Sequence, residues 1–210
     1  MAQVFAGPLS RWYHGEQPGS ELARLRTGVE TWRDDLRASV PAKIAAQLEW
    51  DEGASHCVAH ELGDAGWMAL RLFAFYAERT DLDMPDTVPS LLELDAAWRA
   101  ASDDRFGRSL YGHLLACRAW LPGDFPVTLR VPMPDGETWE VGSVTVLANQ
   151  LKWLNDRTFG AATAEVERWG TLAAPAGGGL LDAARRGYAG LAAAVAAGAG
   201  EGLPVVVREL

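Results

Sequence analysis

The chain has 210 residues, of which 49% are hydrophobic and 22% are charged, and its formal net charge at pH 7 is −9. This composition is typical of a globular protein with a sizeable core and excludes a largely disordered chain. The negative charge argues against nucleic-acid and anionic-membrane partners, since both require a basic surface on the protein.

The sequence shows no targeting or membrane-spanning segment. Residues 1–9 lack the basic and apolar regions of a signal peptide. The longest run of small apolar residues, 190–200, is too short and too glycine-rich to cross a bilayer. We therefore expect a cytoplasmic protein whose cysteines, Cys57 and Cys117, are reduced. Because Lys43 and Lys152 are the only lysines while arginine and alanine are common, we also expect a bacterial source.

Helical periodicity dominates the first 120 residues. Ser20 is a candidate N-cap, and the apolar residues from Leu22 to Leu36 recur at spacings of three and four, which predicts an amphipathic helix. Further helices are predicted over 41–50, 55–79, 89–98 and 103–120. Five helices in this stretch predict a bundle-like helical half over residues 1–121.

The periodicity changes after residue 121. Val127, Leu129 and Val131 alternate with other residues at period two, and the following Pro-Asp-Gly over 134–136 predicts a hairpin turn into a strand over 138–141. Ser143 is the predicted N-cap of a helix that runs to Leu154. A last helix over 180–197 and a strand over 204–207 follow. We therefore predict an α+β fold, predominantly helical, in which residues 122–210 pack with the helical half as one domain.

Three of the four histidines and both cysteines fall in two short clusters, His56-Cys57-x-x-His60 and His113-x-x-x-Cys117. On a helix, residues four apart share a face, so each cluster would present two metal-capable side chains together. A metal site on His56 and His60, completed by Asp64 or Glu61, would take zinc or another divalent transition metal. Two histidines alone hold zinc weakly, so solvated histidines and no cofactor remain the simpler expectation.

The second cluster lies on the apolar stripe of its predicted helix, which favours a neutral core histidine at His113 and a packing role for Cys117. A joint site with the first cluster would require the two helices to meet. We also consider a small-molecule pocket between the helical half and the hairpin, lined by Trp67, Tyr111 and His113.

The motifs of common enzyme classes are absent. The sequence has no His-Glu-x-x-His, no phosphate-binding Walker loop, no Gly-x-Gly-x-x-Gly after a strand and no Gly-x-Ser-x-Gly. No residue can therefore be assigned a catalytic role, which favours a protein without catalytic activity.

Nine tryptophans are a further unusual feature. Trp12 with Tyr13, and Trp139 in the predicted hairpin, lie where helical burial does not account for them, and exposed aromatic residues commonly anchor protein interfaces. The alternative is that these residues seal the hairpin onto the rest of the chain. Our leading hypothesis is an acidic protein-binding protein of the inhibitor, immunity or adaptor kind, whose partner is another protein or a second copy of this chain. Metal binding and small-molecule binding are the alternatives.

Overall fold

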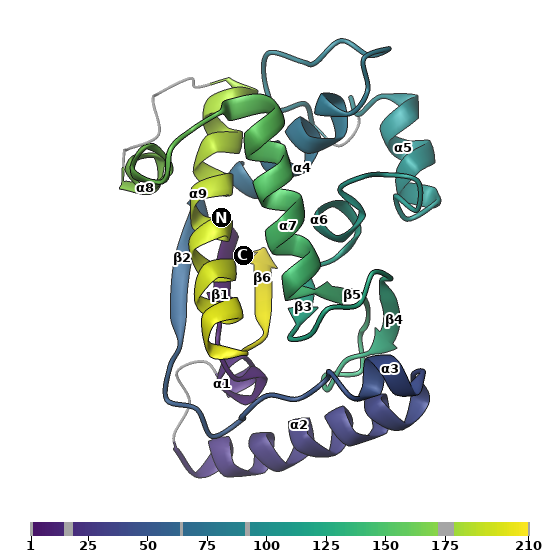
Figure 1. Ribbon diagram of the computed structural model, residues 1–210, viewed down its shortest axis with the longest axis vertical. Helices are drawn as coiled ribbons and strands as arrows, with labels where there is room; N and C mark the ends of the chain where they lie inside the picture. The colour runs from purple at the N-terminus through teal and green to yellow at the C-terminus, as the bar shows by residue number, and fades with distance from the viewer. Residues whose placement is uncertain (1, 15–18, 64, 91–92, 172–178, 210) are drawn as a thin grey trace.

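The computed structural model describes residues 2–14, 19–63, 65–90, 93–171 and 179–209. Figure 1 shows one mixed β-sheet with helices packed on both of its faces. The elements, in chain order, are β1 (Ala2–Ala6), α1 (Leu9–His14), α2 (Gly19–Ser39), α3 (Ala42–Ala45), β2 (Val58–Gly63), α4 (Gly66–Ala77), α5 (Ala96–Asp103), α6 (Gly112–Ala116), β3 (Ala119–Leu121), β4 (Leu129–Pro132), β5 (Thr138–Ser143), α7 (Val144–Leu154), the π-helical turn η1 (Asn155–Phe159), α8 (Thr163–Thr171), α9 (Leu180–Glu201) and β6 (Val205–Glu209).

The sheet joins strands from both ends of the chain. Its strand order is β2-β1-β6-β3-β5-β4, so the first and last strands lie side by side in its interior. β1 is antiparallel to both β2 and β6, β6 is antiparallel to β3, β3 is parallel to β5, and β4 and β5 form an antiparallel hairpin. Figure 1 shows this pairing of the purple N-terminal and yellow C-terminal strands behind α9.

Two hydrophobic cores lie on opposite faces of the sheet. Successive side chains of a strand point to opposite faces, and β6 supplies both cores: Val205 and Val207 pack with α4, α7 and α9, whereas Val206 packs with α1 and α2. The helices therefore cover both faces of the sheet interior. Among the described residues, no helix combines the length and the apolar character that a membrane span requires.

The predicted helical half is wrong. The chain begins with a strand in the sheet interior, and strands on both sides of residue 121 share one sheet. The helix predicted over 55–79 begins only at Gly66, because residues 58–63 pair with β1 and Gly63 then adopts a left-handed φ of +80°. The helix predicted over 103–120 is reduced to α6, since Arg105 and Phe106 also have positive φ values and residues 119–121 form β3.

The predictions for the second half of the chain are largely confirmed. The hairpin forms around residues 134–136, where the Met133 amide donates to the carbonyl of Glu137 at 2.7 Å. Ser143 caps α7 through its hydroxyl oxygen, which accepts from the amide of Val146 at 3.1 Å. The C-terminal strand is also present, although it pairs with β1 and β3 and not with the hairpin.

Candidate functional site: a cleft between α4, α5 and residues 104–110

A cleft of about 500 Å³ lies between the C-terminal end of α4, helix α5 and the connecting segment 104–110. It is open to solvent, and its lining is mainly apolar with charged side chains among it. Two phenylalanines, Phe75 and Phe106, and the small side chains of Ala97 and Ala101 provide the apolar part. A concave apolar surface with a few charged groups is the usual form of a binding site.

An aromatic cluster packs around the two phenylalanines that line the cleft. Phe75 of α4 and Trp98 of α5 meet edge to face, with their ring centroids 5.2 Å apart. The ring of Phe106 contacts both of them, at 5.0 Å from Trp98 and 6.3 Å from Phe75. Such edge-to-face pairs contribute about 0.5–1.5 kcal/mol each beyond the area they bury. These contacts therefore stabilise the apolar part of the lining.

The segment that closes one side of the cleft has a strained backbone. Arg105 and Phe106 have φ values of 52° and 54°, in the left-handed region that side chains with a Cβ rarely adopt. The Phe106 amide donates to the carbonyl of Ala101 at 2.7 Å just after the end of α5, and Phe106 lines the cleft. Backbone strain costs of order 1–3 kcal/mol per residue and is concentrated at functional sites.

The rim of the cleft carries charges of both signs. Glu78 accepts a hydrogen bond from the amide of Leu110 at 2.8 Å, which ties the segment 104–110 to α4. Arg79 makes two hydrogen bonds of 3.0 Å to Asp81 and lies with its guanidinium 5.5 Å from the ring centre of Phe75. Arg108, by contrast, projects into solvent with 97% of its side chain exposed.

The half-buried Arg71 contacts the aromatic cluster. The Arg71 guanidinium lies against three rings, those of Trp67, Trp98 and Phe106, with its central carbon 5.4, 5.5 and 6.0 Å from their centres. Its Nε donates to the carbonyl of Leu115 at 3.0 Å, at the end of α6. Burial lowers the pKa of Arg71 to about 10, so the group remains charged at neutral pH and can hold the aromatic rings through cation–π contacts.

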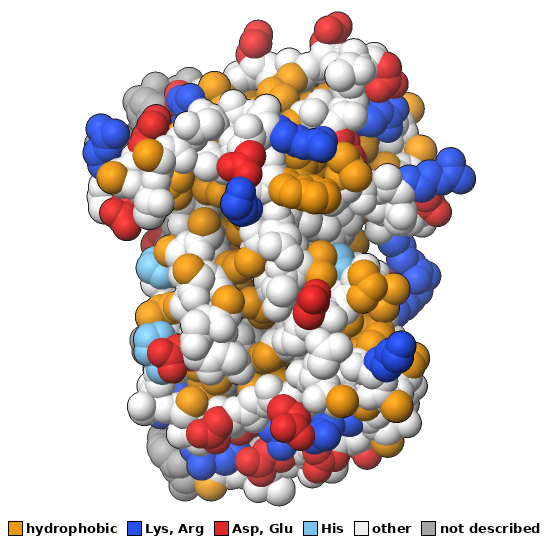
Figure 2. Space-filling model, in the orientation of Figure 1, with side chains coloured by type: hydrophobic (Ala, Val, Ile, Leu, Met, Phe, Trp, Pro, Cys, Tyr) orange, Lys and Arg blue, Asp and Glu red, His pale blue; other side chains and the backbone are white. Residues whose placement is uncertain are grey.

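Large apolar side chains are also exposed at the rim of the cleft and on α7. Leu110, at the rim, has 47% of its surface exposed, and Trp153 at the end of α7 has 50%. Arg157 stacks on Trp153 with its guanidinium 5.7 Å from the ring centre. Figure 2 shows hydrophobic side chains in small patches on one face of the molecule, with charged side chains gathered toward both ends.

The predicted metal ligands do not share a helix face. His60 lies in β2 and is half-buried, while His56 is exposed in the segment before that strand. Glu61 follows His60 directly in the strand, so the two side chains point to opposite faces of the sheet. Asp64 lies outside the described residues. No group of three or more His, Cys, Asp or Glu residues in the described part of the chain is placed to hold a metal ion. Metal binding stays a prediction, which metal analysis of protein purified without a histidine tag would test.

His113 and Cys117 lie close together in the core. A Cβ placed on Gly142 of β5 would lie 2.8 Å from Nδ1 of His113 and 3.1 Å from Sγ of Cys117. The Ser143 amide donates to Nδ1 of His113 at 3.0 Å, and burial raises the pKa of Cys117, so the thiol stays protonated. The two clusters are not brought together, because β1, β6 and β3 lie between β2 and β5 in the sheet.

The residues expected to line a small-molecule pocket are core residues that do not line this cleft. Trp67, Tyr111 and His113 are each buried, and Trp67 packs edge to face on Trp120 with ring centroids 6.1 Å apart. Sequence patterns pointed to these aromatic positions but missed Phe75, Phe106 and Leu110. The sequence marks that surface only by the run of charged residues around position 104. The positive φ values of Arg105 and Phe106, which shape it, cannot be predicted from residue type, since they fall on non-glycine residues.

The three predicted interface aromatics belong to, or pack against, the core that the hairpin shares with α1 and α2. Trp12 is buried beneath Arg208, whose guanidinium lies 4.2 Å from the ring centre. Burial raises the pKa of Tyr13, and the nearby carboxylates of the hairpin turn add to this effect. Trp139 is half-buried, and Arg118 lies 5.2 Å from its ring centre. These contacts fit the alternative in which the aromatic residues pack the hairpin onto the rest of the same chain. A role for Trp139 at an interface stays a prediction.

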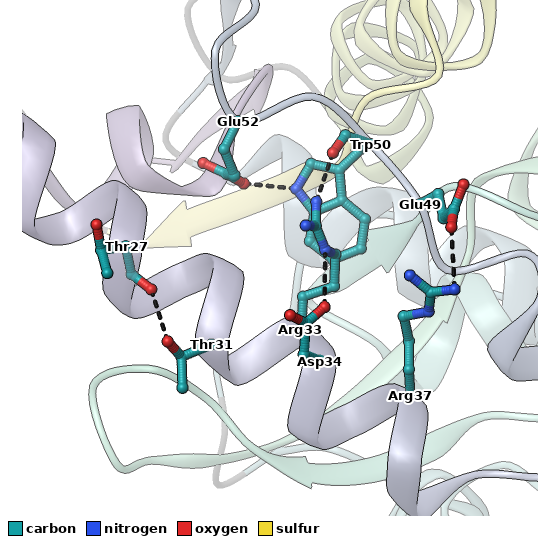
Figure 3. Close-up of polar contacts among 8 residues, drawn as sticks. All are labelled: Thr27, Thr31, Arg33, Asp34, Arg37, Glu49, Trp50 and Glu52. Carbon is teal, nitrogen blue, oxygen red and sulfur yellow. Dashed lines mark hydrogen bonds and ion pairs between the residues drawn. The ribbon is translucent and has the colours of Figure 1, made fainter.

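A buried carboxylate that the sequence analysis missed holds the N-terminus of α1. Glu52 accepts from the amide of Leu9 at 3.0 Å, from the amide of Ser10 at 2.9 Å and from the indole nitrogen of Trp50. Arg33 of α2 donates to the carbonyl of Trp50 at 2.6 Å, as Figure 3 shows. Because all of these partners are internal, we assign Glu52 a structural role.

Comparison with protein-family models, with curated proteins and with solved structures found no match for this chain. Its function is therefore argued from the geometry of the cleft.

Proposed function

We propose that this chain is a protein-binding protein, of the inhibitor, immunity or adaptor kind, that receives an apolar side chain of its partner in the cleft between α4 and α5. The observation that carries the proposal is an open cleft of about 500 Å³ whose lining combines phenylalanine side chains with charged ones. The centres of protein interfaces have this form, in which a pocket takes an aromatic or aliphatic anchor and polar groups surround it.

The shape and surroundings of the cleft favour a protein partner. A small-molecule site buries most of the surface of its ligand, whereas this cleft opens to solvent along one side. The exposed Leu110 adds apolar surface at the rim. Elsewhere on the surface, Arg157 of η1 and Trp153 of α7 form a pair of residue types that are enriched in interfaces. The net charge of −9 further suits a partner with a basic surface.

The second candidate function is small-molecule binding, which the volume of the cleft favours. Small-molecule pockets have volumes of about 300–1,000 Å³, and the cleft lies within that range. Native mass spectrometry of the purified protein separates the two candidates. A retained small mass that disappears when the cleft is filled would favour the small-molecule function over the protein-binding function.

The direct test uses N-acetylphenylalanine amide as a probe for a partner's side chain. We expect its titration to shift the NMR signals of residues that line the cleft, those of Ala101, Phe106 and Leu110 among them. Filling the cleft with Ala100→Trp should abolish these shifts, because Ala100 lines the cleft on the exposed side of α5.

The matched control is Arg99→Trp, which adds the same side chain at the neighbouring exposed position that does not line the cleft. This variant should bind the probe as the unmodified chain does. Shifts that are absent from the unmodified chain, or that persist in Ala100→Trp, would contradict a binding role for the cleft.

A further inference from the structure

The outer edge of the sheet at β2 is unpaired among the described residues. β2 is the terminal strand of the sheet, and it contacts β1 on one side and α9 and α4 on one face. In Figure 1 the strand forms the left margin of the sheet, beside α9. An unpaired strand presents a row of free N–H and C=O groups to any strand that can approach it.

Backbone hydrogen bonds elsewhere in the sheet fix which groups of β1 point toward β2. The N–H and C=O of one residue in a strand point to the same neighbour, and this direction alternates along the strand. The Val207 amide donates at 2.9 Å to the carbonyl of Arg118, the residue before β3. The backbone N–H and C=O of Val206 therefore point the other way, toward β1. Val206 pairs with Phe5. The backbone N–H and C=O of Phe5 therefore point toward β6, and those of its neighbour Val4 point toward β2.

The same alternation then fixes the free edge of β2. Val4 is opposite His60, so the backbone groups of His60 point inward to β1. The N–H and C=O groups of Ala59 and Glu61 consequently point outward, away from the sheet. These two residues, spaced two apart, can serve as the hydrogen-bonded positions of an antiparallel ladder with another strand.

The opposite edge of the sheet, at β4, is protected. The Met133 amide donates to Glu137 of the hairpin, so the outward-pointing residues of β4 are Arg130 and Pro132. Pro132 has no N–H, and its carbonyl accepts from the indole of Trp32 at 2.6 Å. β2 has six residues without a proline or a lysine, which are the residues that commonly block strand edges. The edge that is open to pairing is therefore β2.

The geometry points to a second copy of this chain as the partner of β2, paired antiparallel about a two-fold axis that passes between the two His60 residues. In this register Ala59 of one copy lies opposite Glu61 of the other, and each pair exchanges two backbone hydrogen bonds. The Glu61 carboxylate, which Gln3 of the same chain holds at 3.3 Å, then faces a neutral alanine and not a second carboxylate. In this register no two carboxylates are opposed, the two His60 residues lie opposite each other at the axis, and pairing doubles the six-stranded sheet.

The first test is sedimentation equilibrium of the full chain and of Ala59→Pro. We expect the unmodified chain to form a dimer that dissociates on dilution. Ala59→Pro removes an outward N–H and leaves the hydrogen bonds to β1 intact, so it should weaken the dimer at least about tenfold while the circular dichroism spectrum is retained. Arg130→Pro is the matched control, since it removes an outward N–H from β4 and should leave the dimer unchanged.

Two further variants test the same pairing without proline, in case proline perturbs the strand. Ala59 is exposed, so charged side chains fit there without disturbing the core. Ala59→Glu would place two carboxylates opposite each other and should weaken the dimer, whereas Ala59→Lys would face Glu61 and should strengthen it. A chain that is monomeric at every concentration, or a dimer whose stability is the same in both variants, would overturn the proposal.

Discussion

At the scale of single residues, two glycines determine how closely helices α4 and α9 can approach each other. A Cβ placed on Gly187 of α9 would lie 2.2 Å from the carbonyl oxygen of Gly66, at the start of α4. One placed on Gly66 would lie 3.2 Å from the carbonyl oxygen of Ala183. These atoms belong to the backbone, which cannot rotate away as a side chain can. The two helices therefore pack with their backbones nearly in contact.

We expect Gly187→Ala to destabilise the protein by about 3 kcal/mol or more, at the upper end of the range for overpacked sites, because the added methyl group forces α4 and α9 apart. The measurement is urea denaturation. Gly28→Ala is the control: Gly28 lies within α2 with open space at its Cβ position, so alanine should raise the free energy of unfolding by about 0.5–1 kcal/mol. Equal effects of the two substitutions would show that the helices can separate without cost.

Glu52 provides a second prediction at this scale. Its carboxylate accepts from two backbone amides of α1 and from Trp50, and it is fully buried. Glu52→Gln replaces one acceptor oxygen with an NH₂ group that faces a donor, so we expect a loss of about 2–4 kcal/mol in urea denaturation. Glu49→Gln removes an exposed ion pair to Arg37 and should cost under about 1 kcal/mol. A Glu52→Gln variant as stable as Glu49→Gln would show that the buried carboxylate is dispensable.

At the scale of secondary-structure elements, His113 links α6 to the start of α7. Its Nδ1 accepts from the amide of Ser143, the N-cap residue of α7, and this bond requires that nitrogen to be unprotonated. Burial lowers the pKa of His113 below its ordinary value of about 6.5. The folded state therefore favours the neutral imidazole, whereas the unfolded chain takes up a proton near pH 6.5.

This difference makes the stability of the fold dependent on pH in a defined direction. Below about pH 6.5 the unfolded state binds more protons at His113, so the free energy of unfolding should fall as the pH falls, by at most about 1.4 kcal/mol per pH unit. Above about pH 6.5 the contribution of the neutral His113 to the free energy of unfolding is fully present. Denaturation of the unmodified chain and of His113→Gln between pH 7.5 and 5 measures it. The variant should be less stable at pH 7.5 and should show a shallower pH dependence. Parallel curves would mean that His113 is not the group responsible.

The elements that sequence patterns predicted well are those whose partners are local. The hairpin around 134–136 and the Ser143 cap of α7 depend on residues a few positions apart, and both are present. The sequence predicts a helix where β2 forms, because His56 and His60 have helical spacing and the strand's partner, β1, lies more than fifty residues away. The helix predicted over 103–120 is interrupted near its start by the positive φ values of Arg105 and Phe106, and only α6 forms within that range.

The candidate site could not be assembled from the sequence for the same reason. Phe75, Trp98 and Phe106 are apolar residues at helical spacings, and nothing in the sequence separates a ring that lines a cleft from one that fills a core. The distinction arises only when α5 and the segment 104–110 fold back on the end of α4. The histidine and cysteine clusters were conspicuous in composition, but β1, β6 and β3 separate β2 from the strand beside His113 and Cys117.

At the scale of the whole molecule, the two ends of the chain close the sheet. β6 lies between β1 and β3, so it is the sole bridge between the N-terminal pair of strands and the strands β3, β5 and β4 in the described sheet. It also contributes to both cores, through Val205 and Val207 on one face and Val206 on the other. The pairing of β6 with β1 and β3 can form only after residues 205–209 have been synthesised.

Removing residues 203–210 should therefore abolish cooperative folding. Burial of three valines stabilises the fold by about 1.5–3 kcal/mol each, and this sum is comparable to the entire net stability of a typical domain, about 5–15 kcal/mol. The loss of the hydrogen bonds to β1 and β3 adds to it. Circular dichroism with thermal denaturation measures the outcome, and a synthetic peptide of residues 203–210 should restore a cooperative transition by completing the sheet. A truncated chain that unfolds cooperatively near the temperature of the full chain would show that the two groups of strands are held together by their helices and not by β6.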